Sequence, residues 1–314
     1  MNITTPTTHA STKLPVMVYI HGGSFLFGGA NKGVFDCVNF VTHAANRHTP
    51  IVAVNFNYRV GLGGFLASST IKADLKRDGF EGVGNFGLYD QQVALHWVNR
   101  YIASFGGDSG NVTIYGESAG GMSVSHQIAA KSPAPFHRAI AMSGHLNTIP
   151  TWTLSHHEKR YCALLKYLHI DPDSPSALDQ LRNVPQDVVS RATIHVEGIF
   201  NATGNPCDDG VFHAVTPSFN AISSPASWLK GYMVGDTLDE GMIFYESFCE
   251  DSFSTIRAGI ASRVGVDAAD TILELYGVTP DLPKDELVKC MEDMAGDAAF
   301  KAHNWVAAHR SDIP

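Results

Sequence analysis

The sequence predicts an α/β fold with a mostly parallel central sheet, and three observations lead to this fold class. Segments rich in Val, Ile and Tyr alternate with segments of helical period, as in a parallel sheet covered by helices. The chain has 314 residues, of which 44% are hydrophobic and 17% charged, so it can bury a large core. A G-x-S-x-G sequence also lies between a β-rich segment and a helical one.

Five segments have the composition of strands. They are residues 16–20, 51–58, 112–115, 138–143 and 231–234. The first two are dense in Val, Ile and Tyr, which is typical of parallel strands that are buried on both faces. We therefore expect them in the middle of the sheet.

A long helix is expected between the second and third strands, in the sequence GLYDQQVALHWVNRYIASFGG. Its Val93, Trp97 and Tyr101 recur at helical spacing, which predicts that they face the sheet. The glycines at 106 and 107 should end this helix.

Ser118 lies between Gly116 and Gly120 in the stretch VTIYGESAGG, where a strand should end and a helix begin. So tight a turn needs glycines around the serine, because larger side chains would collide there. The hydroxyl would then stand above the sheet at the positive end of a helix. The sequence therefore predicts that Ser118 is a nucleophile, which a neighbouring base must activate.

Two further motifs follow expected strands. YIHGGSF places Gly22 and Gly23 after the first strand, where backbone N–H groups could stabilise the negative oxygen of an acyl-transfer transition state. The N–H of Ala119, the residue after the serine, is the expected third donor. GDTLDEG places Glu240 after the last strand, at the edge where open parallel sheets bind ligands.

Each motif alone has a plainer explanation. G-x-S-x-G occurs by chance, HGG can be a simple turn, and an acidic DEG is most often a solvated loop. Their order is more specific. A glycine-rich loop, then the serine, then the acid, each at the end of a strand, is the chain order of the α/β-hydrolase fold.

Four stretches between about residues 14 and 244 resemble the type-B carboxylesterases, a family that includes cholinesterases and fungal lipases. They are PVMVYIHGGSFLFGG, VNFNYRVGLGGFLA, GNFGLYDQQVALHWVNRYIASFGGDSGNVTIYGESAGG and GDTLDEG. The resemblance implies an ester hydrolase in which Ser118 is the nucleophile and Glu240 the triad acid. The three backbone donors named above would form its oxyanion hole, and Glu117, which matches the family motif, is expected to be structural.

The histidine that would complete such a triad is not identifiable. The family order requires it after Glu240, where only His303 and His309 qualify, and their stretch predicts a helix without a preceding strand. Both are expected to be exposed or half-buried helix residues. The histidines at 126, 145 and 213 come earlier and lack the motif context. Three functions therefore stay open: an ester hydrolase, a catalytically impaired binding module of cholinesterase type, and an inactive shortened product.

We expect residues 1–314 to form a single, partial α/β-hydrolase domain, because family members are longer at both ends. The proline-rich residues 151–225 would be an insertion over the active-site face, and a helical region without a strand is expected at about 251–310. The sheet would keep its middle strands and lack its edge strands. Two strands built for burial would then expose unpaired N–H and C=O groups, so we expect self-association, aggregation or repair by the terminal segments.

Bulk properties limit the partners. The formal charge is −9 and no Lys/Arg cluster interrupts it, which disfavours nucleic acid and anionic membranes. No apolar run is long enough to span a membrane. Five scattered cysteines argue against a metal site and a disulfide framework, and no cofactor is expected. The N-terminal stretch lacks the apolar core of a signal peptide, the compartment stays open, and the expected partner is a small-molecule ester.

Overall fold

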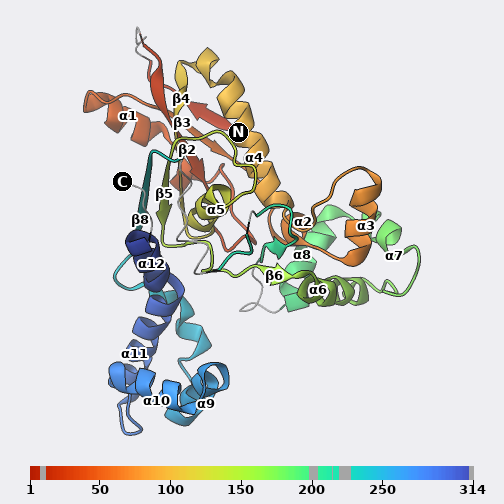
Figure 1. Cartoon of the computed structure of the whole chain (residues 1–314), viewed down its shortest axis with the longest axis vertical. Coiled ribbons are helices and arrows are strands. Elements are labelled where there is room, and N and C mark those ends of the chain that lie inside the picture. Colours follow the sequence, from red (N-terminus) through yellow and green to blue (C-terminus); the bar gives the residue numbers. More distant parts are fainter. Residues whose placement is uncertain (8–11, 198–203, 214, 219–227, 311–314) are drawn as a thin grey trace.

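A six-stranded sheet with the order β1-β3-β2-β4-β5-β8 forms the centre of the molecule (Figure 1). The structure is a computed structural model, and it describes residues 1–7, 12–197, 204–213, 215–218 and 228–310. The strands are β1 (Asn2–Thr4), β2 (Leu14–Ile20), β3 (Val52–Phe56), β4 (Gly107–Glu117), β5 (Arg138–Met142) and β8 (Gly231–Gly235). All five expected strands are present and run parallel to one another, which confirms the predicted mostly parallel sheet.

The strands in the middle of the sheet are buried on both faces, as their composition predicted. Every residue of β3 is buried, and Val16, Val18 and Ile20 of β2 are wholly excluded from solvent. Helices cover both faces, so apolar side chains are stabilised on either side of these strands.

The short strand β1 was not predicted. It pairs antiparallel with β3, with Ile3 opposite Val54. Three residues give no readable alternation, so only the packing shows this strand. It covers part of the edge of β3, so on this side of the sheet the N-terminal segment repairs the edge, which is one of the outcomes expected from the sequence.

The helices in the first half of the chain are α1 (Val38–Asn46), α2 (Gly61–Phe65), α3 (Ser69–Arg77), α4 (Phe86–Tyr101) and α5 (Ala119–Ile128). The helix α5 packs against β4 and β5. The predicted buried face of α4 was wrong for Val93, which is 69% exposed, and Tyr101, which is 41% exposed, whereas Trp97 is half-buried against the core. The buried residues are instead Leu88, Gln91, Leu95 and Val98. These recur by three and four residues alternately, which follows the helical period better than steps of four.

Residues 151–225 contain α6 (Leu154–Tyr167), α7 (Ala177–Arg182), α8 (Gln186–Glu197) and a small sheet of β6 (Trp152–Thr153) with β7 (Cys207–Asp208). Leu164, Leu165 and Ala192 pack with Leu62 and Leu66, so this region lies against α2, which follows β3 (Figure 1). Residues 198–203, 214 and 219–225 of it lie outside the described part. Its placement over an active-site face stays a prediction.

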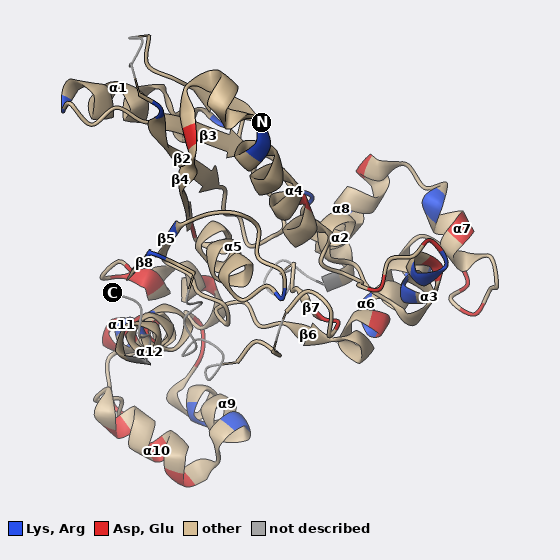
Figure 2. Cartoon of the chain, turned by 45° about the horizontal axis from the view of Figure 1, so that its top comes forward, with Lys and Arg blue, Asp and Glu red and all other residues tan. Residues whose placement is uncertain are grey.

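The C-terminal region is helical and, in its described residues, without a strand, as predicted. It consists of α9 (Phe253–Val264), α10 (Val266–Leu275), α11 (Lys284–Gly296) and α12 (Ala302–Arg310). Figure 2 shows basic residues on α9 and acidic ones on α10, and Arg257 pairs with Asp270 between them at 2.5 Å. The helix α12 packs beside β8. Among the described helices, none is long and apolar enough to cross a membrane.

Candidate active site

Ser118 lies in the turn between β4 and α5 and is half-buried. Its backbone has φ 55° and ψ −126°, in a region that non-glycine residues rarely adopt. Hydrogen bonds hold it there. The Ser118 N–H donates to the Met142 oxygen, and the Met122 N–H donates to the Ser118 oxygen, both at 2.9 Å. Such strained residues persist where the surroundings fix them, and they concentrate at functional sites.

Glycines around Ser118 allow the turn to close. A Cβ atom added at Gly116 would lie 2.4 Å from the backbone carbon of Gly120. One added at Gly120 would lie 2.1 Å from the oxygen of Ile20, at the end of β2. The G-x-S-x-G spacing is therefore a packing requirement, because the start of α5 rests directly on the neighbouring strands.

The loop after β2 lies against the serine. A Cβ added at Gly22 would lie 3.2 Å from the Ser118 Cβ and 2.5 Å from the Glu117 oxygen. Gly23 has φ 113°, and Ser24 continues the turn at φ 55°. The structure thus brings Gly22 of the HGG motif to the predicted nucleophile, whereas the neighbours of Gly23 belong to Phe27. Sequence reasoning passed over Ser24, whose only signal was its position after two glycines.

A buried polar network connects this loop to α5. The Tyr58 hydroxyl donates to the backbone oxygen of His21 at 2.8 Å, and its ring stacks on the His21 imidazole. The Ser123 hydroxyl donates to the Ala119 oxygen at 2.7 Å, and the Gln91 amide donates to Ser123 at 2.9 Å.

Burial keeps Tyr58 protonated. It raises the pKa of Tyr58, and the nearby Ser123 only partly offsets that rise. The hydroxyl therefore stays a donor to the His21 oxygen. Sequence reasoning missed Tyr58 and Ser123, although both lie in the stretches that carry the resemblance.

Glu240 follows β8 and begins a short 3-10 helix, Glu240–Ser247. Its side chain is buried, with 8% of the residue exposed, and its Oε1 accepts from the Thr237 N–H at 2.7 Å. Gly241 packs so closely on α11 that a Cβ there would collide with the Glu292 oxygen. Residues 235–239 of the acidic loop are exposed, whereas Glu240 itself is not solvated, because α11 covers this end of the loop.

The negative charge of Glu240 acts on the carboxyl group of Glu117. Burial, and secondly the negative charge of Glu240, raise the pKa of Glu117. Part of the Glu117 side chain is exposed, but its Oε2 reaches within 3.3 Å of a Cβ placed at Gly22. The Glu117 carboxyl therefore lies near the glycine loop, and Glu240 lies close enough to Glu117 for its charge to act on that carboxyl. No hydrogen bond joins Ser118 directly to Glu240 within the described residues.

The two histidines that follow Glu240 differ from each other. His309 is exposed on α12, as predicted, and its Nδ1 lies 2.8 Å from the Trp305 oxygen. His303 is buried, with 4% exposed, which corrects the expectation of an exposed or half-buried residue. The helix α12 turns His303 inward, towards His145.

The earlier histidines are buried. Burial, and secondly His303, lower the pKa of His145 to about 3. The Nδ1 of His126 lies 2.9 Å from the Nε2 of His213. In the part of the chain that the structure describes, no histidine forms a hydrogen bond with the Ser118 hydroxyl.

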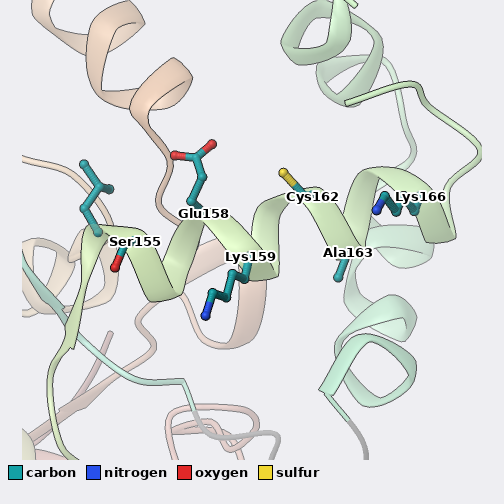
Figure 3. A pocket seen from close by; sticks show the side chains of 7 residues that line it. Ser155, Glu158, Lys159, Cys162, Ala163 and Lys166 are labelled. Carbon is teal, nitrogen blue, oxygen red and sulfur yellow. The ribbon is translucent and has the colours of Figure 1, made fainter. Parts of the chain in front are cut away.

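A separate hollow runs along α6 (Figure 3). It is lined by Leu154, Ser155, Glu158, Lys159, Cys162, Ala163 and Lys166. None of the residues predicted from the motifs lines it. The candidate active site is therefore the junction of β4, α5 and the glycine loop.

Comparison with known proteins identifies the family and the fold. A model of the carboxylesterase family matches residues 1–308. The chain is 30% identical to "Lipase 3" of Yarrowia lipolytica over 303 residues, covering 94% of this chain and 54% of that protein. It is 31% identical to "Para-nitrobenzyl esterase" of Bacillus subtilis over 283 residues, covering 88% of this chain and 54% of that protein.

A solved structure of a PNB esterase superposes on the chain with a TM-score of 0.76 at 29% identity. The superposition covers 98% of this chain and 62% of that structure. The chain thus spans about half the length of the curated relatives it matches.

Proposed function

The chain belongs to the carboxylesterase family and has the α/β-hydrolase fold, and from this premise we propose that it is a carboxylic ester hydrolase acting through Ser118. One observation carries the proposal. Ser118 is held at φ 55° on the turn before α5, with the Gly22 loop against it. A strained serine at a helix amino terminus beside a glycine loop suits acyl transfer.

In the proposed reaction the Ser118 oxygen attacks the ester carbonyl carbon while a base takes the hydroxyl proton. The bond from that carbon to the alcohol oxygen then breaks, the alcohol leaves with a proton, and the acyl group stays on Ser118. Water cleaves the acyl-enzyme by the same route, which releases the acid and restores the serine.

The N–H groups of Gly22, Gly23 and Ala119 are the proposed donors to the negatively charged oxygen that forms in each step. Support comes from the close approach of Gly22 to Ser118 and from Ala119 as the first residue of α5. Loss of one such donor typically lowers the rate about 10²–10³-fold. Glu240 is the proposed acid that would orient and stabilise a histidine base, and its buried carboxylate near Glu117 supports this role.

A second candidate function is a binding module of the same family with impaired catalysis. It is favoured by one observation: no described histidine is hydrogen-bonded to Ser118. Removal of the base from a comparable triad lowers turnover by about 10⁶-fold. The residual rate is about 10³–10⁴ times that of the uncatalysed reaction in water. A chain without a working base would therefore bind esters and hydrolyse them very slowly.

A fluorophosphonate probe tests the proposal, because it labels only an activated serine. We expect the folded chain to be labelled on Ser118, and Ser118→Ala to lose the label while keeping its melting temperature. Hydrolysis of p-nitrophenyl butyrate by variants that replace His145, His303 or His309 with alanine would then identify the base. A folded, unlabelled chain would reject the hydrolase in favour of the binding module.

A further inference from the structure

Two buried histidines form a hydrogen bond between α5, the helix that follows Ser118, and the segment of residues 204–213. The Nδ1 of His126 on α5 lies 2.9 Å from the Nε2 of His213. His126 is wholly excluded from solvent, and His213 is buried as well. A neutral imidazole has one N–H and one bare nitrogen, so one ring donates this hydrogen bond and the other accepts it. The bond therefore joins two neutral side chains.

The histidine pair reaches the glycine loop through Phe25. The wholly buried Phe25 ring meets the His126 ring edge to face, with centroids 6.2 Å apart, and packs on Phe65 with centroids 5.0 Å apart. Phe25 also has φ 59°, a left-handed conformation that is costly for a residue with a side chain. Such a conformation persists only where the surroundings fix it. The ring is the anchor of this strained loop, and His126 forms one wall of its site.

Segment 204–213 contacts both the glycine loop and the end of α5. At one end, the Gly204 N–H donates to the oxygen of Ser24 in the glycine loop at 3.1 Å. At the other end, the Lys131 N–H, shortly after α5, donates to the Phe212 oxygen at 2.8 Å. The histidine pair therefore lies where three parts of the candidate site meet.

We propose that His126 and His213 are positioning residues, whose hydrogen bond fixes Phe25 and with it the glycine loop beside Ser118. Their effect on catalysis rests on the proposed function, whereas the anchoring of the loop is a property of the fold. When the pair separates, the Phe25 ring loses a wall of its site. The loop can then leave the strained conformation that aims its N–H groups.

Protons should separate the pair. The outer nitrogens, His126 Nε2 and His213 Nδ1, have no hydrogen-bond partner among the described residues. A first proton would place a positive charge and an unpartnered N–H among buried rings, and a second would remove the accepting nitrogen. Burial lowers the pKa of both histidines, that of His213 to about 4. Acid therefore favours a state in which the pair is open to water.

The titratable groups described around the pair do not offset this cost. After burial and His213, the facing His145 lowers the pKa of His126 further. Asp209 and Asp208 lie near His213, but burial outweighs their effect on its pKa. The Asp209 carboxylate already accepts three backbone N–H groups, and that of Asp208 accepts a threonine hydroxyl. Both carboxylates are thus engaged elsewhere.

Hydrogen exchange followed by mass spectrometry tests the anchor without requiring activity. In the wild type, we expect the glycine loop to lose protection about tenfold or more between about pH 7 and 5, while β3 stays protected. His213→Ala should lose this protection already at about pH 7. His213→Gln can keep a hydrogen bond to His126 but does not titrate. It should be protected like the wild type at about pH 7 and lose several-fold less protection in acid.

Fluorophosphonate labelling of Ser118 gives the catalytic readout. His213→Ala should be labelled about tenfold or more slowly at about pH 7, because misplacing a catalytic group by about 1 Å can cost about 10²-fold in rate. His213→Gln should recover most of that rate. Its rate relative to the wild type should rise towards about pH 5, and this ratio cancels the titration of the catalytic base. His96→Gln, at an exposed position on α4, is the matched control and should behave as the wild type.

Thermal melts show which variants are folded. Loop protection that is equal at both pH values in the wild type would overturn the proposal. So would a folded His213→Ala with wild-type protection, or a His213→Gln as impaired as His213→Ala. If His213→Ala does not fold, the pH dependence of the wild type and of His213→Gln still decides. A wild type that loses loop protection in acid but is never labelled would reject the proposed hydrolase and support the anchor.

Discussion

The Tyr58 hydroxyl donates a hydrogen bond to the His21 oxygen at 2.8 Å, while the two rings stack with centroids 4.3 Å apart. The His21 carbonyl shares a planar peptide unit with the Gly22 N–H. The contact therefore fixes the direction of a proposed oxyanion donor. Tyr58 thus holds the backbone of the glycine loop through a single hydrogen bond and a ring contact.

Tyr58→Phe should loosen this loop while keeping the ring stacking. The His21 oxygen would lose its buried donor, so we expect the free energy of unfolding to fall by about 1–3 kcal/mol. Fluorophosphonate labelling of Ser118 should slow as well. Urea unfolding and labelling rates measure the two effects. Tyr101→Phe, on an exposed ring, is the control and should change stability by less than about 0.5 kcal/mol. Equal stability of the two variants would show that the hydrogen bond of the Tyr58 hydroxyl does not contribute to the stability of the fold.

Gly120→Ala should be among the most damaging single substitutions in the chain. Its Cβ would lie 2.1 Å from the Ile20 oxygen. The atoms that it would meet belong to the backbone, so no side chain can move aside to remove the clash. We expect a loss of about 3 kcal/mol or more, seen as a lower urea midpoint or as insoluble protein. Gly63→Ala, in α2 with nothing within 4 Å of the new atom, is the contrast. It should be neutral or stabilise by up to about 1 kcal/mol. A similar loss of stability in Gly120→Ala and Gly63→Ala would contradict the close packing described at the turn.

Glu240→Gln should lower the pKa of Glu117. The negative charge of Glu240 is the second cause of the raised Glu117 pKa, and burial is the first. Removing that charge should therefore bring the pKa part of the way back to its usual range, with the rest held by burial. Titration of the Glu117 side-chain carbon by NMR measures the shift. Glu246→Gln, farther along the same helix, should leave it unchanged. An unaltered Glu117 pKa in Glu240→Gln would mean that the two carboxyl groups are not close.

Stability should fall as the pH drops from about 6.5 to 4. Burial lowers the pKa of His213 to about 4, and it also lowers the pKa of His126 beside it. Unfolded histidines take up protons near pH 6.5. Between these values the unfolded chain binds more protons than the folded one, so acid favours unfolding.

Urea unfolding at several pH values measures this effect. In His213→Gln the fall in stability across the same window should be smaller, because one buried histidine no longer titrates. His309→Gln removes an exposed histidine and serves as the control. A pH profile for His213→Gln that parallels the wild type would contradict the assignment.

The sequence alone placed the five parallel strands, the turn at Ser118 and the glycine loop. These features have local causes. Buried parallel strands need runs of apolar residues, and a turn at φ 55° needs glycines beside it. The family resemblance added chemical roles to residues that were already grouped by their position after strands.

Only the tertiary structure decided the rest, because it depends on residues far apart in the chain. The buried face of α4 is set by the sheet beneath it, and β1 exists because β3 offers an edge at Val54. Glu240 is buried because α11 packs on Gly241, and His303 is buried because α12 turns it inward. The bond from Tyr58 to His21 spans 37 positions of sequence. No local pattern encodes such contacts, since each forms only once the sheet has brought its two partners together.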